Sequence, residues 1–380
     1  MTGRPTPRVE IRIDKLVDNA LALSSLCGSR GIHFTAVTKA VCGSPRVAAA
    51  LRACGIRSLG DSRIPNLRRM RESGLNAEYM LIRSPAPSEA DVAVDWADVS
   101  LNTEIRVMRQ LARAARKRGT LHRVVLMIEL GDLREGILPS EIDEVVSETI
   151  RLDGVELAGI GTNLACLSGV RPTAEKMREL CSIADRLERR HGVKLQYVSG
   201  GNSANYQWLV STPDPGRINH LRVGESMLLG CDTLTRKPIP GMQTDVFTLV
   251  AEVIEIKTKP SQPYGEICQD AFGHRPSLEN RGDRRRAILA IGRQDVEPAA
   301  LTPKMPADII GASSDHLVLD ATETDLHVGA EVKFEMGYSA LLRAMTSRYV
   351  AKTYADDADW GDAADVRVPD HAEGRGALRA

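Results

Sequence analysis

The chain has 380 residues, of which 43% are hydrophobic and 4% aromatic, and its 50 basic side chains balance 50 acidic ones. This length is enough for one large domain and a smaller one, and the balanced charge argues against a nucleic-acid-binding protein. The start, MTGRPTPRVEIRID, lacks the apolar core of a signal peptide, and no later run approaches the roughly 20 apolar residues that span a bilayer. We therefore expect a cytoplasmic protein that has no nucleic-acid or membrane partner.

Seven cysteines and eight histidines are scattered along the chain without the C-x-x-C or H-E-x-x-H spacing of a metal site. An odd number of cysteines also fits a disulfide framework poorly. We expect no catalytic metal.

From about residue 30 to 230, short β-rich runs alternate with amphipathic helical stretches, which is typical of repeated βα units. One of the helices is expected over 102–119, with Asn102 capping its start and Gly119 closing its end. Eight units favour a closed (β/α)8 barrel over an open doubly wound sheet, and no G-x-G-x-x-G follows any of the strands. The expected strands are 33–39, 57–61, 78–82, 97–101, 123–130, 156–161, 195–199 and 219–223.

Beyond residue 241 the rhythm changes to strand-like runs joined by turns, which predicts a separate β domain. The fold class expected is therefore α/β, a TIM barrel over residues 1–235 followed by a C-terminal mainly-β domain over 236–355. The first strand, 8–13, is a candidate to pack on the second domain. The polar, charged segment 356–380 is expected to be a disordered tail.

Lys39 stands in AVTKAVCGSP, at the carboxyl end of the first expected barrel strand. Barrel enzymes keep their chemistry at this end of the strands. A lysine there can form a Schiff base with a carbonyl when burial or neighbouring cations keep its amine neutral. A lysine at a strand end is more commonly solvated or salt-bridged. Whether Lys39 is catalytic therefore depends on the residues at the other strand ends.

Polar residues follow four more of the expected strands. GDLREG places Arg134 after the fifth strand and GTNLAC places Asn163 after the sixth, while SGGNSAN and RVGES follow the seventh and eighth. Barrels frequently bind phosphate with the loops after strands seven and eight, through backbone N–H groups that glycine leaves accessible. Ordinary turn chemistry explains either loop alone, whereas both together favour a phosphate site. Its candidates are Gly200, Gly201, Asn202, Ser203 and Gly224.

Taken in order, the motifs VTKAVCG, GDLREG, GTNLA, GGNSA, LRVGES, GASSDHLVLD and GYSALLRAMTSRY make this chain resemble a known enzyme family. The family is that of the alanine racemase-like, fold type III pyridoxal phosphate enzymes, and the resemblance is closest to their ornithine racemase branch. It covers roughly residues 8 to 352. It implies a barrel that binds pyridoxal 5'-phosphate, joined to a C-terminal β domain.

The resemblance also implies roles for single residues. Lys39 would hold the cofactor and then exchange the proton at the substrate's Cα. Arg134 would approach the cofactor's phenolic oxygen, and Asn163 stands where relatives often have a histidine. Arg222 would face the pyridine nitrogen; because an arginine stays charged, that nitrogen would stay unprotonated, which suits proton exchange better than transamination. The phosphate would be received by Ser203, Gly224 and Tyr338, with Asn202 nearby.

Racemisation needs acid/base groups on both faces of the reacting carbon. Relatives use a tyrosine of the partner subunit, a few residues after a GE pair, and the matching stretch here, YGEICQDAFG, departs from that pattern. Asp270 is the first candidate for the opposite-face group and Cys268 the second, with Tyr264 nearby; a structural Asp270 in a turn is an equal alternative. Ser314 and Asp315 match the family's partner-chain loop near the substrate carboxylate, which implies a homodimer with shared sites.

The sequence thus predicts a homodimeric pyridoxal phosphate-dependent amino-acid racemase, with ornithine or another basic amino acid as substrate. The substrate rests on the resemblance alone. The alternatives are a decarboxylase of the same fold, against which Arg222 argues, and a non-catalytic pyridoxal phosphate-binding protein, against which the second domain argues. A cationic substrate would need a carboxylate at the barrel rim, where the sequence offers Asp61, Asp132 and Glu225.

Overall fold

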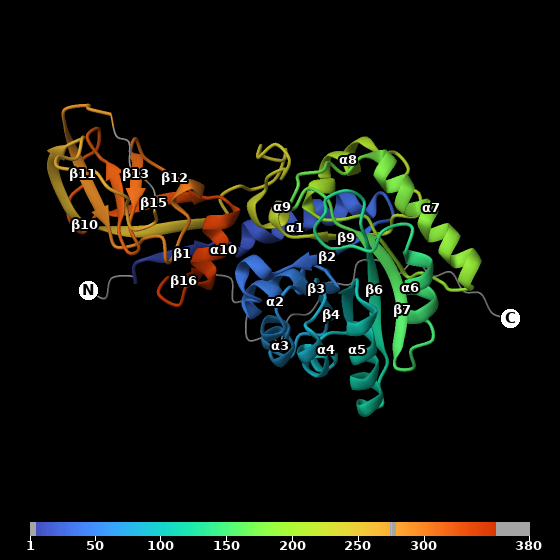
Figure 1. Ribbon diagram of the computed structural model, residues 1–380. Coiled ribbons are helices and arrows are strands. Elements are labelled where there is room, and N and C mark those ends of the chain that lie inside the picture. The colour runs from blue at the N-terminus through green and yellow to red at the C-terminus, as the bar shows by residue number, and fades with distance from the viewer. Residues whose placement is uncertain (1–4, 274, 276–278, 355–380) are drawn as a thin grey trace.

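The computed structural model describes residues 5–273, 275 and 279–354. Figure 1 shows two parts, a barrel surrounded by helices and a β-sheet domain beside it. The expected tail at 356–380 lies outside the described residues. Within the described part of the chain, no helix is both long enough and apolar enough to cross a membrane.

Eight parallel strands close into the barrel, which confirms the predicted (β/α)8 fold. Each strand overlaps one of the eight expected runs. The strands read as near-continuous apolar runs because both of their faces are buried, by the barrel interior and by the helices. The strands are β2 (His33–Val37), β3 (Ser58–Asp61), β4 (Glu78–Leu81), β5 (Val99–Asn102), β6 (His122–Ile128), β7 (Val155–Thr162), β8 (Tyr197–Ser199) and β9 (His220–Val223).

Helices surround the barrel (Figure 1), and three short 3-10 turns lie in connections from a strand to the next helix. They are α1 (Ile13–Gly28), η1 (Lys39–Val41), α2 (Pro45–Ala53), α3 (Ile64–Glu72), η2 (Pro87–Glu89), α4 (Ala90–Trp96), α5 (Ile105–Arg118), α6 (Ile142–Thr149), α7 (Ala174–His191), η3 (Ser203–Asn205), α8 (Tyr206–Ser211) and α9 (Glu225–Leu229).

Helix α5 corrects one local expectation. Gly119 closes the helix in a left-handed conformation with φ 65°, as predicted. Asn102 does not cap its start, because α5 begins at Ile105 and Asn102 is the last residue of β5. The Asn102 amide donates to the backbone oxygen of Ser100 at 3.1 Å and to its hydroxyl at 2.9 Å. The Asn102 side chain is therefore hydrogen-bonded inside the barrel and does not cap α5.

The second domain is built on one sheet, in the order β12-β15-β10-β11-β14-β13. The first described strand, β1, joins this sheet, antiparallel to β10 and parallel to β16, and so belongs to the second domain although it precedes the barrel in the sequence. The strands are β1 (Arg8–Ile11), β10 (Phe247–Pro260), β11 (Asp283–Leu289), β12 (Leu301–Pro303), β13 (Asp308–Ala312), β14 (Leu317–Asp320), β15 (Glu331–Met336) and β16 (Ala351–Tyr354), with the turn η4 (Pro298–Ala300) before β12.

One helix of the second domain, α10 (Tyr338–Thr346), was not among the expected elements. It lies between the sheet and the barrel (Figure 1) and packs against η1, the turn that begins at Lys39. Its buried residues, Ala340, Leu341, Ala344 and Met345, recur at helical spacing. The second domain therefore reaches the carboxyl end of β2 through this helix.

A chain of hydrogen bonds runs through the barrel interior beneath Arg222, whose side chain is only 4% exposed. Arg222 donates to the hydroxyl of Ser199 at 2.5 Å, and that hydroxyl lies 2.8 Å from Nδ1 of His220. Nε2 of His220 lies 2.9 Å from the hydroxyl of Thr35. Every group is satisfied when Ser199 donates to Nδ1 and a neutral His220 donates from Nε2 to Thr35.

Within the second domain, Arg8 links β1 to β15, and its side chain is only 3% exposed. It donates to both carboxylate oxygens of Glu331, at 2.6 and 2.8 Å, and to Glu10 at 3.0 and 2.7 Å. Arg8→Met should lower the free energy of unfolding by about 3 kcal/mol, because it leaves two carboxylates without their buried cation.

Urea-induced unfolding followed by circular dichroism measures this loss. Lys333→Met is the matched control, since Lys333 contacts Glu10 at 3.3 Å from an exposed position and should change the value by less than about 0.5 kcal/mol. Equal losses in both variants would contradict the prediction.

His220 predicts an acid-sensitive stability. Burial, and then the charge of Arg222, lower the pKa of His220 to about 3. Below the ordinary pKa of about 6.5 the unfolded chain binds a proton that the folded chain refuses, so stability falls as the pH falls toward 3. The quantity compared is the loss of the free energy of unfolding between about pH 7 and pH 5. This loss should be about 2 kcal/mol smaller in His220→Gln than in the wild type. His327→Gln, a change at an exposed histidine, should retain the wild-type pH dependence.

Candidate active site

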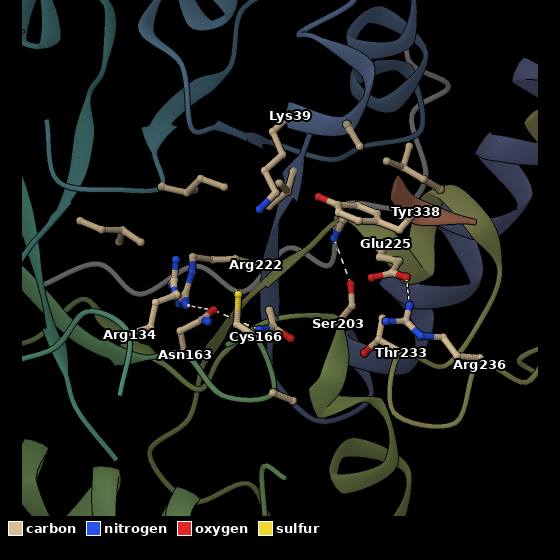
Figure 2. A pocket seen from close by; sticks show the side chains of 18 residues that line it. Lys39, Arg134, Asn163, Cys166, Ser203, Arg222, Glu225, Thr233, Arg236 and Tyr338 are labelled. Carbon is tan, nitrogen blue, oxygen red and sulfur yellow. Dashed lines mark hydrogen bonds and ion pairs between the residues drawn. The ribbon is translucent and has the colours of Figure 1, made fainter. Parts of the chain in front are cut away.

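A cavity of about 250 Å³ lies at the carboxyl ends of the barrel strands, close to the lower end of the range for small-molecule sites, roughly 300 Å³. Residues from separate strand ends and from α10 line it (Figure 2). The structure brings all eight expected cofactor-binding residues to this cavity: Lys39, Arg134, Asn163, Asn202, Ser203, Arg222, Gly224 and Tyr338.

Lys39 reaches into the cavity from η1, directly after β2 (Figure 2). The turn is held from below by Asp61, whose carboxylate accepts from the Thr38 hydroxyl at 2.9 Å and from the Asn66 amide at 3.0 Å. Cys42 ends η1 in a left-handed conformation with φ 52°. Asp61 is fully buried and does not line the cavity, so this rim carboxylate supports the turn that carries Lys39.

Asp132 has a similar structural role in the loop that carries Arg134. Its carboxylate accepts backbone N–H groups of Leu167 at 2.8 Å, Cys166 at 3.2 Å and Val170 at 3.3 Å, and so ties the loop after β6 to the loop after β7. Although burial acts to raise it, these backbone hydrogen bonds hold the pKa of Asp132 below its ordinary value.

Arg222 and Asn163 share a polar corner of the cavity. Besides its bond to Ser199, Arg222 donates to the backbone oxygen of Thr162 at 2.8 Å. The same guanidinium nitrogen also donates to Oδ1 of Asn163 at 3.4 Å. Burial lowers the pKa of Arg222 to about 10, so the side chain stays cationic at neutral pH. Oδ1 of Asn163 also accepts from Asn202 at 3.0 Å. Nδ2 of Asn163 is buried and has no partner among the described residues.

Ser203 and Tyr338 lie on the other side of the cavity (Figure 2). The hydroxyl of Ser203 accepts the backbone N–H groups of Gly224 and Ser226, both at 3.2 Å, which leaves its own proton available to a ligand. Burial, and then Glu225, raise the pKa of Tyr338, so its hydroxyl stays protonated at neutral pH. Both side chains can therefore donate to an anion.

Glu225 lines the cavity, alone among the three rim carboxylates considered from the sequence. It forms an ion pair with Arg236, and burial raises its pKa. Arg236 and Thr233 also line the cavity, and sequence reasoning missed both. A local signal next to them is Gly230, which ends the short helix α9 in a left-handed conformation with φ 63°.

The structure does not bring the expected second acid/base group or the expected carboxylate-side loop to this cavity. Asp270 is exposed and accepts the backbone N–H of Phe272 at 2.8 Å, as in a turn. Ser314 and Asp315 are exposed and bonded to each other at 3.1 Å. Their roles were assigned in a partner subunit, so they stay predictions. The alternatives Cys268 and Tyr264 are exposed too.

The cavity fits pyridoxal 5'-phosphate, the cofactor that the resemblance implies. Lys39 offers an amine to its aldehyde, and the hydroxyls of Ser203 and Tyr338 offer donors to its phosphate. Two buried polar atoms on the cavity wall, Nδ2 of Asn163 and the hydroxyl of Thr233, have no partner among the described residues. Buried polar groups normally have partners, so both point to a polar ligand.

Comparison with known proteins points to one family. Residues 11–231 match the family described as alanine racemase, N-terminal domain. The ornithine racemase of Acetoanaerobium sticklandii is 41% identical over 350 residues, which cover 91% of this chain and 99% of that protein. The lysine racemase of Thermotoga maritima is 39% identical over 350 residues, which cover 92% and 98%.

Solved structures agree on the fold. The alanine racemase of Streptomyces coelicolor A3(2) superimposes with a TM-score of 0.73 at 20% sequence identity, over 92% of this chain and 98% of that one. The family matches over the barrel, and two relatives of near-equal length are similar over almost the whole chain. This chain therefore belongs to the alanine racemase N-terminal domain family.

Proposed function

We propose that this chain is a pyridoxal 5'-phosphate-dependent racemase of a basic amino acid, with ornithine and lysine as the first substrates to test. The observation that carries the proposal is the near full-length similarity to an ornithine racemase and a lysine racemase. The cavity supports it, because Lys39 and the buried Arg222 both line a space suited to the cofactor.

Lys39 is the group proposed to move the proton at the substrate's Cα. The chemistry that the cofactor supplies when bound is withdrawal of electrons from that carbon, which makes its proton acidic. Lys39 takes and returns the proton on one face. Arg222 stays charged, and its three partners prevent the guanidinium from turning, so it presents a fixed cation that has no proton to release.

The opposite face needs a second group, and we propose Asp270 of a partner subunit in a homodimer. Ser314 and Asp315 of that partner would order the space near the substrate carboxylate. The support is that all three are exposed on the second domain and that none lines the cavity of its own chain. Cys268 and Tyr264 remain the alternatives to Asp270.

We also propose domain limits of 1–235 and 236–355, since α9 ends at Leu229 and the long strand β10 begins at Phe247. The homodimer and the cytoplasmic location stay predictions.

In D2O, the wild-type protein should convert L-ornithine or L-lysine to the D form with deuterium at Cα and without release of CO2. Lys39→Ala should lower this rate by at least about 1,000-fold, because it removes a proton-transfer group and the cofactor's attachment point. Nuclear magnetic resonance and chiral chromatography measure the two products. Lys194→Ala, at an exposed site, is the matched control.

Two outcomes would contradict the proposed function. Release of CO2 would identify a decarboxylase. A bound cofactor without any Cα exchange would identify a non-catalytic pyridoxal phosphate-binding protein.

Shared active sites predict complementation between two inactive variants. In a heterodimer of Lys39→Ala and Asp270→Asn, one site holds both defects and the other holds neither. Subunits mixed in equal amounts should therefore recover about a quarter of the wild-type rate, since half of the dimers carry one intact site. The racemisation rate before and after subunit exchange checks this. A mixture no more active than its parts would show that the sites are not shared through Asp270.

A further inference from the structure

One side of the cavity is built partly by residues 231–238, a part of the connection between α9 and β10 that we call the 231–238 loop. Figure 2 shows Thr233 and Arg236 of this loop beside Ser203, Glu225 and Tyr338, the side on which phosphate is expected. Neither Thr233 nor Arg236 is among the residues that the sequence predicts at the cofactor.

The 231–238 loop is held in one conformation before any ligand arrives. Buried Asp232 accepts from the Gln207 amide at 2.5 Å, the Thr235 hydroxyl at 2.8 Å and the backbone N–H of Leu234 at 3.0 Å. The backbone N–H of Arg236 donates to the oxygen of Asp232 at 2.8 Å. Little conformational entropy is left for the loop to lose on binding.

The charges of the cavity are unevenly placed. Arg134 and Arg222 lie next to Asn163 on one side, and Lys39 reaches in between the two sides (Figure 2). On the phosphate side, the cation that lines the cavity is Arg236, and it is paired there with the carboxylate of Glu225. A phosphate dianion next to that carboxylate would be repelled unless Arg236 lies close to both.

Thr233 gives a second, independent indication. Its hydroxyl is buried on the cavity wall and makes no hydrogen bond with any residue that the structure describes. A buried hydroxyl without a partner costs about 1 to 3 kcal/mol, so a ligand atom that accepts its proton is favoured.

We propose that Thr233 and Arg236 bind the phosphate monoester of the cofactor, with Arg236 shared between that phosphate and Glu225. Thr233 donates its hydroxyl proton to one phosphate oxygen, and the Arg236 guanidinium offers paired N–H donors to the others. The inference rests on the cofactor of the proposed function and extends its phosphate site beyond Ser203, Gly224 and Tyr338.

Pyridoxal 5'-phosphate and pyridoxal, which lacks the phosphate, separate this contact from every other contact of the cofactor. The dissociation constant of each is measured by equilibrium dialysis on the full chain after its cofactor has been removed. Arg236→Gln should raise the constant for the phosphorylated form at least about 10-fold and change that for pyridoxal less than about 2-fold. Thr233→Val should raise the first about 5-fold.

Lys237→Gln is the matched control, because it removes the same charge from an exposed position of the same loop. It should leave both dissociation constants unchanged. Arg236 is itself 66% exposed, so its replacement is compatible with folding.

An Arg236→Gln variant that binds both forms as the wild type does, or that loses affinity for both equally, would overturn the inference. A wild-type protein that binds the phosphorylated form and carries it on Lys39 after borohydride reduction would still support the proposed function in that case. A wild-type protein that takes up neither form would overturn both.

Discussion

The interior of this barrel is organised around one permanent charge. Removing the Arg222 guanidinium from water costs several kcal/mol unless its N–H groups are paired, and Ser199, Thr162 and Asn163 supply the pairing. Each partner is held in turn, Ser199 by His220 and Asn163 by Asn202. A fixed cation thus forms the floor of the cavity, and the side chains above it are placed relative to a rigid base.

The cost of burying a charge also decides the role of the carboxylates at the barrel rim. Asp61 and Asp132 looked suitable for a cationic substrate, yet each is used to hold a loop, the first beneath Lys39 and the second across two strand ends. Only Glu225 faces the cavity, and Arg236 neutralises it. Structural use of buried carboxylates therefore leaves the cavity of a single chain with a net excess of cations, which suits an anionic cofactor.

The second domain takes part in the site as well. Helix α10 packs on the turn that begins at Lys39 and contributes Tyr338, while β1, which precedes the barrel in the sequence, lies in the sheet of that domain. Contacts between the two domains, such as the 2.9 Å hydrogen bond between Ser44 and Tyr354, lie beside this turn. The geometry around Lys39 consequently depends on both domains.

The sequence by itself determined the barrel, because eight apolar runs and their polar strand ends are local patterns, and strand closure brings those ends together. Seven of the eight residues expected at the cofactor lie at the strand ends that this closure brings together, whereas Tyr338 comes from α10 of the second domain. Three features were decided only by tertiary structure. Asn102 bonds inside the barrel because Ser100 lies within reach, α10 is a helix that was not among the expected elements, and Thr233 and Arg236 reach the cavity from the loop that follows α9. Each depends on contacts that form only after the chain has closed on itself, which local periodicity does not encode.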